Sequence, residues 1–142
     1  MGFSLVGAAA IIGVSILMGI EIIISTTIPI FTDVDDAFYE MRNRAIAEVQ
    51  TLINITDVTS QVNGSDYDIN ITVENKGSIT LKTNFFNILI NGIKRNFSCT
   101  KSYIHPENEV IFSIPSISGS GTSRLKVVTN NGISDYYEFI LP

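Results

Sequence analysis

An apolar run from Gly2 to Phe31 constrains this chain most, because Glu21 is its single charged residue. An α-helix needs about 20 mainly apolar residues to cross the hydrocarbon core of a bilayer. Leu5 to Ile24 contains eleven Leu, Ile or Val residues. Each favours insertion by about 0.3–0.6 kcal/mol, whereas one carboxylate at the bilayer centre opposes it by about 3 kcal/mol. The run therefore predicts a single helix that spans a membrane.

The length of the run distinguishes a retained anchor from a cleaved signal peptide. A secretory signal has a basic start and an apolar region of about 7–15 residues. Here apolar residues follow Met1 directly, and the run is about twice as long as such a region. We expect an uncleaved signal-anchor over residues 1–31, with cleavage as the alternative.

The residues that flank the run indicate its orientation. The C-terminal flank is acidic, and no basic residue occurs there before Arg42. Four Asn-x-Ser/Thr sequons follow, and this motif is an acceptor for glycosylation only outside the cytoplasm. Both features favour a single-pass cell-membrane protein with its C-terminal domain outside. The candidate glycosylation sites are Asn54, Asn63, Asn70 and Asn96.

Small residues within the anchor have the spacing that allows two helices to approach closely in lipid. Ala9 and Gly13 lie one turn apart, as do Ser15 and Gly19. We expect these four positions to contribute to self-association or to be ordinary features of a small-residue span. Twenty residues of helix span about 30 Å, which places Glu21 at the outer rim of the bilayer. The remaining apolar residues, 22–31, would form a collar that tilt or another helix must cover.

Residues 32–55 have the pattern of an amphipathic helical spacer. Apolar residues recur at steps of three and four, while charged residues occupy much of the other face. Asp33 is the expected N-cap, and Pro29 is expected to kink or break the preceding helix. The apolar face would pack on the following domain, on a second copy, or on neighbours in a filament. Its members are Phe31, Val34, Phe38, Met41, Ala45, Val49 and Leu52.

Residues 56–142 have the pattern of an extracytoplasmic all-β domain. Alternating segments rich in Ile, Val, Thr, Phe and Tyr are separated by turn residues, and no helical pattern lies between them. Asn91-Gly92 between two such segments indicates a hairpin. We predict about seven strands in an immunoglobulin-like sandwich, which makes the chain α+β by segments. The strands are expected at Tyr67–Val73, Ile79–Leu81, Phe85–Ile90, Ile93–Phe97, Val110–Ile114 (ended by Pro115), Leu125–Val128 and Ser134–Leu141.

The charge and the reactive residues argue against several function classes. The net charge is −5 and no basic cluster occurs, so the sequence has no footprint for nucleic acid. One histidine (His105) and one cysteine (Cys99) cannot form a tetrahedral zinc site, and Cys99 is expected to be a small buried hydrophobic residue. No motif singles out a nucleophile. We expect no enzyme activity, no cofactor and no metal.

Paired aromatic residues are the candidates for an interaction surface. Tyr136 and Tyr137 are adjacent in a predicted strand, as are Phe85 and Phe86. Neighbours in a strand point to opposite faces, so one ring of each pair should be exposed. Exposed aromatic rings are enriched at binding hot spots, although packing within the strand is the simpler interpretation.

The opening Met1-Gly2-Phe3-Ser4, which leads into an Ala- and Ile-rich helix, resembles the archaeal flagella-related protein F family. The order of anchor, acidic and amphipathic helix, and compact β-domain is also similar, as is the turn Asn75-Lys76-Gly77-Ser78. The resemblance implies a non-enzymatic component of the archaellum motor that holds the motor against its own torque. The implied partners are the S-layer protein, which the β-domain would bind in the pseudo-periplasm, archaellum protein G or other motor components, and further copies of the chain.

Two other interpretations remain. A pilin or archaellin subunit would share a long apolar helix and a β-sandwich, but its precursor carries a charged leader, for which Met1-Gly2 leaves no room. The second alternative is a membrane-tethered extracellular binding domain, which would need a concave site.

Overall fold

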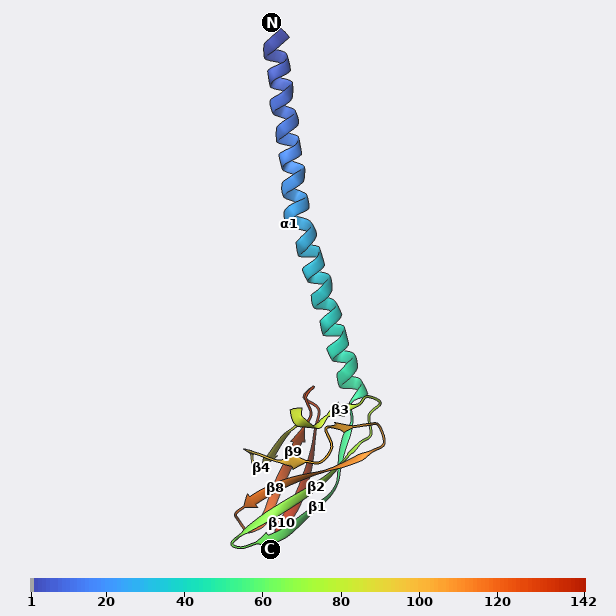
Figure 1. Ribbon diagram of the computed structural model, residues 1–142, viewed down its shortest axis with the longest axis vertical. Helices are drawn as coiled ribbons and strands as arrows, with labels where there is room; N and C mark the ends of the chain where they lie inside the picture. Colours follow the sequence, from blue (N-terminus) through green and yellow to red (C-terminus); the bar gives the residue numbers. More distant parts are fainter. Residues whose placement is uncertain (1) are drawn as a thin grey trace. The chain divides into compact units, whose positions relative to one another are not determined.

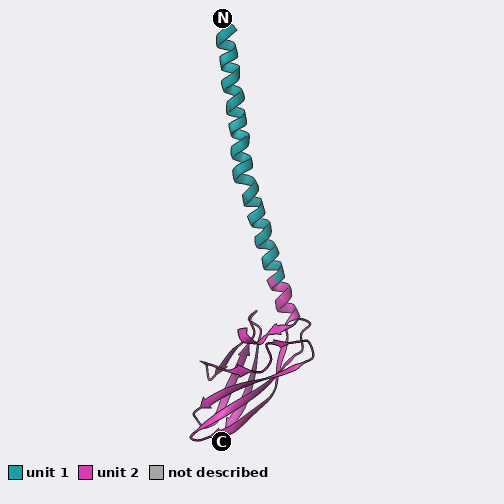
Figure 2. Ribbon diagram, viewed as in Figure 1, with its two compact units in different colours: residues 1–43 teal, residues 44–142 magenta. Residues whose placement is uncertain are grey.

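The computed structural model describes residues 2–142 as two compact units, residues 2–43 and residues 44–142 (Figure 2). One long helix, α1 (Gly2–Gln50), precedes ten strands and one short 3₁₀ helix (Figure 1). This order confirms the predicted fold class, an N-terminal apolar helix followed by antiparallel sheets. The strands are β1 (Ile53–Asn63), β2 (Asp66–Asn75), β3 (Leu81–Lys82), β4 (Asn87–Ile90), β5 (Ile93–Arg95), β6 (Ser98–Cys99), β7 (Tyr103–Ile104), β8 (Glu109–Ile117), β9 (Gly121–Val128) and β10 (Ser134–Leu141), with the 3₁₀ helix at Thr83–Phe85.

Helix α1 continues through Pro29, so a break at Pro29 and a new helix start at Asp33 are both wrong, while the alternative of a kink stays a prediction. Pro29 lacks the N–H that would bond the carbonyl of Ser25 one turn earlier. One missing bond is a small loss in a helix of 49 residues, and proline is tolerated in membrane helices. The hydroxyls of Ser25 and Thr26 donate to the carbonyl of Ile22, at 3.2 and 2.7 Å, and not to the Ser25 carbonyl that Pro29 frees.

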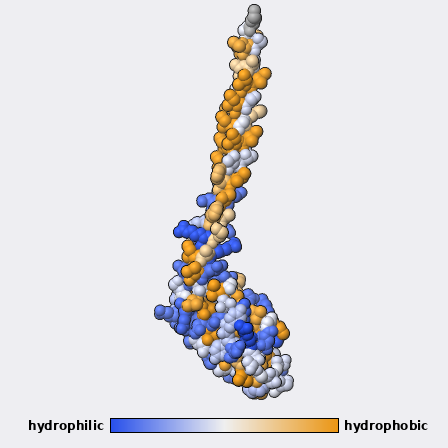
Figure 3. All heavy atoms as spheres, turned by 180° about the vertical axis from the view of Figure 1, so that it is seen from behind, coloured by the Kyte–Doolittle hydropathy of each residue, from blue (hydrophilic) through white to orange (hydrophobic). Residues whose placement is uncertain are grey.

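The apolar side chains of α1 are exposed to its surroundings. It is the one helix in the described part of the chain that is long and apolar enough to cross a membrane. Figure 3 shows the apolar surface along the first part of this helix and a band of hydrophilic side chains after it. A helix that is apolar and uncovered over such a length is the form that lipid would solvate.

Strand β1 begins at Ile53, inside the segment predicted as helical spacer. Its first residues alternate between core and solvent, and Ile53 and Ile55 are buried. The helix therefore does not extend to Leu52 and Ile53. Ile53 and Ile55 are two residues apart, a spacing that puts them on one face of a strand but not on one face of a helix. The division of the chain at residues 31/32 and 55/56 into anchor, spacer and β-domain stays a prediction.

The strands form two four-stranded antiparallel sheets and one small pair. The first sheet has the order β1-β2-β8-β6, the second β10-β9-β4-β5, and β3 pairs with β7. Seven of the ten strands have three or more residues, and β3, β6 and β7 have two each. Six of the seven longer strands lie at predicted positions, whereas β1 was not predicted and the predicted strand Ile79–Leu81 overlaps only the short β3. The two four-stranded sheets contribute to one hydrophobic cluster, in which Phe112 stacks on Phe86 and meets the edge of Phe97. We call residues 53–142 the β-domain.

Strand β8 continues past Pro115, where the sequence predicted its end. Tyr67 pairs with Ile117 and Ile69 with Ile114, so one residue of β2 lies opposite two residues of β8. Such a bulge leaves a position where the missing N–H of proline costs no ladder bond. The next residue, Ser116, has a φ of 55° and donates its N–H to the Asp68 carboxylate at 3.0 Å.

Candidate functional site

The end of α1 is bound to the β-domain by the turn that follows β2. The backbone N–H groups of Lys76 and Gly77 both donate to the carbonyl of Leu52, at 2.8 and 2.9 Å. The N–H of Ser78 donates to the carbonyl of Gln50 at 2.9 Å. The last carbonyls of a helix have no partner within the helix. The turn supplies one, and we call this contact between residues 50–52 and residues 75–78 the junction.

Asn75 holds the turn in place from within the core. Its side chain is fully buried and all of its polar atoms are bonded. Its Nδ2 donates to the carbonyls of Ile79 (2.8 Å) and Ile104 (3.1 Å), and its Oδ1 accepts from the N–H of Gly77 at 3.0 Å. A buried amide with all of its bonds made fixes one backbone geometry, because any other would leave buried polar atoms unpaired.

Gly77 lies where a larger residue would collide with the helix end. A Cβ atom there would lie 2.4 Å from the carbonyl oxygen of Gln50 and 2.7 Å from the nitrogen of Leu52. Both are backbone atoms, so neither can rotate away. The glycine is therefore needed for close approach of two backbone segments.

A second loop also binds the helix end. Asn131, between β9 and β10, donates from Nδ2 to the carbonyl of Ala47 (3.2 Å) and to Thr51 Oγ1 (2.6 Å). Thr51 itself donates its hydroxyl to Ala47 at 2.7 Å. The turn at residues 75–78 and the loop with Asn131 are distant in sequence, and both bond to the end of the helix. A flexible linker between helix and β-domain would need no such bonds.

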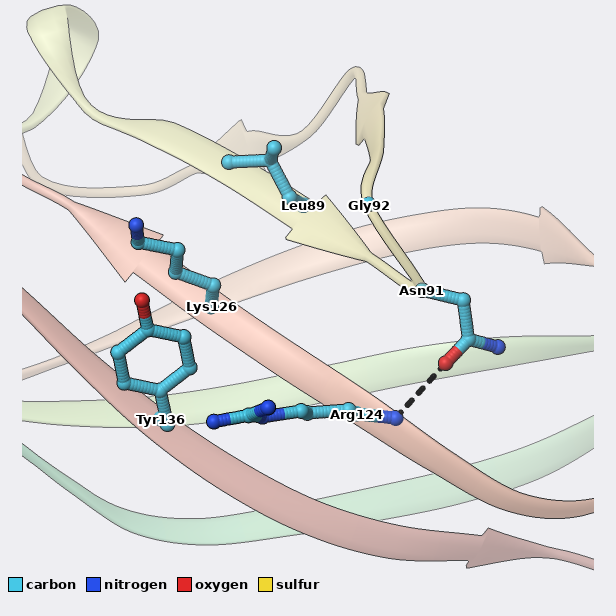
Figure 4. A pocket seen from close by; sticks show the side chains of 6 residues that line it. All are labelled: Leu89, Asn91, Gly92, Arg124, Lys126 and Tyr136. Atoms are coloured by element: carbon cyan, nitrogen blue, oxygen red, sulfur yellow. Dashed lines mark hydrogen bonds between the residues drawn. The ribbon is translucent and has the colours of Figure 1, made fainter.

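A second candidate site lies on the outer face of the sheet β10-β9-β4-β5. A hollow of about 240 Å³ is lined mainly by carbon atoms (Figure 4). At the turn between β4 and β5, the Oδ1 of Asn91 accepts the backbone N–H of Arg124 at 2.9 Å, as the dashed line in Figure 4 marks. The lining residues are Leu89, Asn91, Gly92, Arg124, Lys126 and Tyr136.

Two cations of β9 gather around one tyrosine ring of β10. The Cζ atom of Arg124 lies 4.6 Å from the centre of the Tyr136 ring, and Lys126 Nζ lies 5.0 Å from it. Cations are attracted to the electron-rich face of an aromatic ring. The hydrogen bond from Lys126 is the largest cause that lowers the pKa of Tyr136 below 10, with smaller contributions from the Lys126 charge, Ser134 and the Arg124 charge.

We predict that Lys126→Met raises the pKa of Tyr136 towards 10, because it removes the main group that stabilises the tyrosinate. Tyrosinate absorbance during a pH titration measures this, with Tyr136→Phe subtracted to isolate the one ring. Lys94→Met, on the same face but not beside the ring, is the control and should leave the pKa of Tyr136 unchanged. An equal shift in both variants would contradict the assignment.

The predicted aromatic pairs divide between core and surface. Tyr136 is 47% exposed, whereas Tyr137 is half-buried against the core. Phe85 is 54% exposed with Lys82 Nζ 5.9 Å from its ring, and Phe86 is buried. Arg124 and Lys126 were not among the predicted site residues. Their spacing of two residues, which puts both on one face of a strand, was the available signal, and the pairing of β9 with β10 brings that face beside Tyr136.

The predicted positions in the anchor and the sequons lie as follows. Ala9, Gly13, Ser15, Gly19 and Glu21 are all exposed on α1, and their role in assembly stays a prediction. Among the sequons, Asn63 and Asn96 are exposed, whereas Asn54 and Asn70 are half-buried within β1 and β2. Glycosylation also stays a prediction, and the exposed pair offers the better access.

The lone cysteine and histidine lie at the surface of the β-domain. Cys99 is half-buried at the edge of the core, less buried than predicted, and its Sγ lies 3.2 Å from the Lys101 carbonyl. His105 is exposed, with Nδ1 3.1 Å from Thr80 Oγ1. Within residues 2–142 no group of three His, Cys, Asp or Glu side chains is placed to hold a metal ion.

The chain is similar in sequence and in fold to known proteins of the archaellum. No family model matches the chain. The chain is 27% identical over 143 residues to a provisionally named flagella-related protein F of Methanocaldococcus jannaschii, a match that covers 96% of this chain and 98% of that protein. The fold of this chain is similar to that of the archaellum periplasmic stator protein FlaG from Sulfolobus acidocaldarius, with a TM-score of 0.51 and 20% identity. The match covers 63% of this chain and 99% of FlaG. The resemblance predicted from the N-terminal residues and the order of segments is thus confirmed. The chain is similar to flagella-related protein F over nearly the whole length of both, and it shares a fold with the FlaG stator protein.

Proposed function

We propose that this chain is a non-enzymatic structural component of the archaellum motor, a membrane-anchored stator that binds the S-layer through its β-domain. The junction carries this proposal. A protein that holds a motor against torque must pass force between its membrane helix and its binding domain. One loop donates backbone hydrogen bonds to the helix end, with a buried asparagine behind it, and a second loop donates from the side chain of Asn131. These bonds suit that task.

The predicted topology is compatible with this role. The apolar part of α1 provides the membrane anchor, and the acidic flank with the sequons favours a β-domain in the pseudo-periplasm. The names of the relative and of the structural neighbour, a flagella-related protein and an archaellum periplasmic stator, support a place in the same machinery.

Further copies of the chain are the proposed partners of the exposed helix face. Phe31, Val34, Phe38, Met41 and Ala45 follow the alternating steps of three and four that place residues at the a and d positions of a coiled coil. Phe38 and Met41 are 62% and 61% exposed in the single chain. Two chains anchored in one membrane would meet in parallel along this seam. Archaellum protein G remains a second proposed partner.

Co-sedimentation with purified S-layer sheets tests the proposed function. The full chain in detergent should pellet with the sheets, while an unrelated single-span protein in the same detergent stays in solution. A folded chain that remains in the supernatant would contradict S-layer binding. N-terminal mass spectrometry of the chain from membranes should find residues 1–4 in place, whereas a trimmed and methylated N-terminus would favour the pilin interpretation.

A further inference from the structure

The outer face of the sheet β10-β9-β4-β5 concentrates positive charge on a chain whose net charge is −5. Strand pairing places Tyr136, Lys126, Leu89 and Lys94 in one row across all four strands. Arg124 lies in the next row, opposite Glu138. These rows therefore carry three cations and one carboxylate, a local excess of two positive charges.

The two cations nearest the hollow are positioned by an aromatic ring. Arg124 and Lys126 both approach Tyr136, at 4.6 and 5.0 Å from its centre to Cζ and Nζ. Two like charges beside one ring repel each other, and an anion between them would relieve that repulsion. Their aliphatic stems and Leu89 leave the lining of the hollow mainly carbon. The site thus combines an apolar lining with cations at its edge (Figure 4).

We propose that this hollow binds a sugar ring that carries a carboxylate, as one unit of an acidic polysaccharide or glycan. The C–H groups of the ring would lie against Leu89 and Tyr136, and the carboxylate would reach Arg124 and Lys126. The volume of about 240 Å³ is below that of pockets that enclose a whole ligand, which are about 300–1,000 Å³. One unit of a longer chain fits such a partial site.

The position of the hollow favours a sugar over an acidic peptide. Extended peptides commonly bind by adding a strand to the open edge of a sheet, where unpaired backbone groups are available. The hollow lies over β9 and β4, which are interior strands with partners on both sides. Asn91 also has its amide engaged, since Oδ1 accepts from Arg124 and Nδ2 donates to Ser123 Oγ at 3.2 Å. Recognition must therefore come from the side-chain stems and charges. This inference does not depend on the proposed stator role.

Titration of the full chain in detergent with an oligogalacturonate, a chain of uronic acid units, tests the proposal. We expect binding that weakens with added salt and exceeds that of the neutral sugar maltotriose. Removal of one exposed charge should weaken binding about two- to fivefold, and Arg124→Gln with Lys126→Gln about tenfold. Lys82→Gln is the matched control, because Lys82 also lies over an aromatic ring, that of Phe85, but outside the hollow. It should bind as the parent does.

Three results would overturn the proposal. The first is no measurable binding of the oligogalacturonate by the folded chain. The second is equal binding by the double variant and the parent, which would place the ligand elsewhere. The third is a polyglutamate peptide that binds more tightly than the oligogalacturonate and loses its binding in the double variant, which would make the occupant an acidic peptide. S-layer co-sedimentation that survives the double variant would leave the stator proposal unaffected.

Discussion

Gly77→Ala is expected to separate the end of α1 from the β-domain. The added Cβ would lie 2.4 Å from the Gln50 oxygen, so the turn must move away. That movement breaks the three backbone bonds that Lys76, Gly77 and Ser78 donate to the helix end. At about 1 kcal/mol of net stabilisation for each bond, the junction loses about 3 kcal/mol, or a factor of about 150 in its opening equilibrium.

Hydrogen exchange followed by mass spectrometry measures this loss. Peptides that cover residues 75–78 should exchange about a hundredfold faster in Gly77→Ala, while peptides from β9 and β10 should change little. Ser78→Ala is the matched control, because its exposed side chain is removed but its backbone N–H still donates to Gln50. Unchanged exchange in Gly77→Ala would show that the junction moves apart at no cost in free energy, which would contradict a role for it in transmitting force.

The turn between β4 and β5 could be predicted from the sequence, whereas the junction could not, and the difference shows what a local sequence pattern can predict. Asn91 and Gly92 both have positive φ, 52° and 82°, and Ile90 pairs with Ile93 across them. The turn needs two adjacent residues that tolerate a positive φ, and Asn-Gly is the pair that does so best, so the sequence predicted the hairpin. The junction depends on Gly77 and Gln50, which are distant in sequence, and no local pattern reports their approach.

The wrong predictions also have physical causes. Pro29 was expected to kink or break the helix, but the loss of one backbone bond does not break a helix of 49 residues. Pro115 was expected to end β8, but the bulge opposite Asp68 accommodates it. For the candidate site, alternation predicted that one ring of each aromatic pair is exposed. It could not predict that two cations of β9 lie beside Tyr136, because strand register is a tertiary property.

Self-association along α1 is the prediction with the largest effect on assembly. The seam supplies only five a and d residues from each chain, so it is not expected to hold two free chains together by itself. Anchoring in one membrane raises the effective concentration of the chains and confines them to a parallel arrangement. The seam is therefore expected to be occupied in the membrane-anchored chain.

Cysteine cross-linking in nanodiscs or membranes tests the seam directly. In a Cys99→Ser background, Val34→Cys should form a disulfide between two chains on mild oxidation, because position 34 would face its copy. Asp36→Cys, on the opposite side of the same helix turn, should not. Adding Phe38→Asp to the Val34→Cys chain should reduce cross-linking at least tenfold, since a carboxylate would then replace a ring that the seam would bury. Equal cross-linking at positions 34 and 36 would indicate random collision and would exclude the seam, because only a fixed interface distinguishes the two faces of one helix.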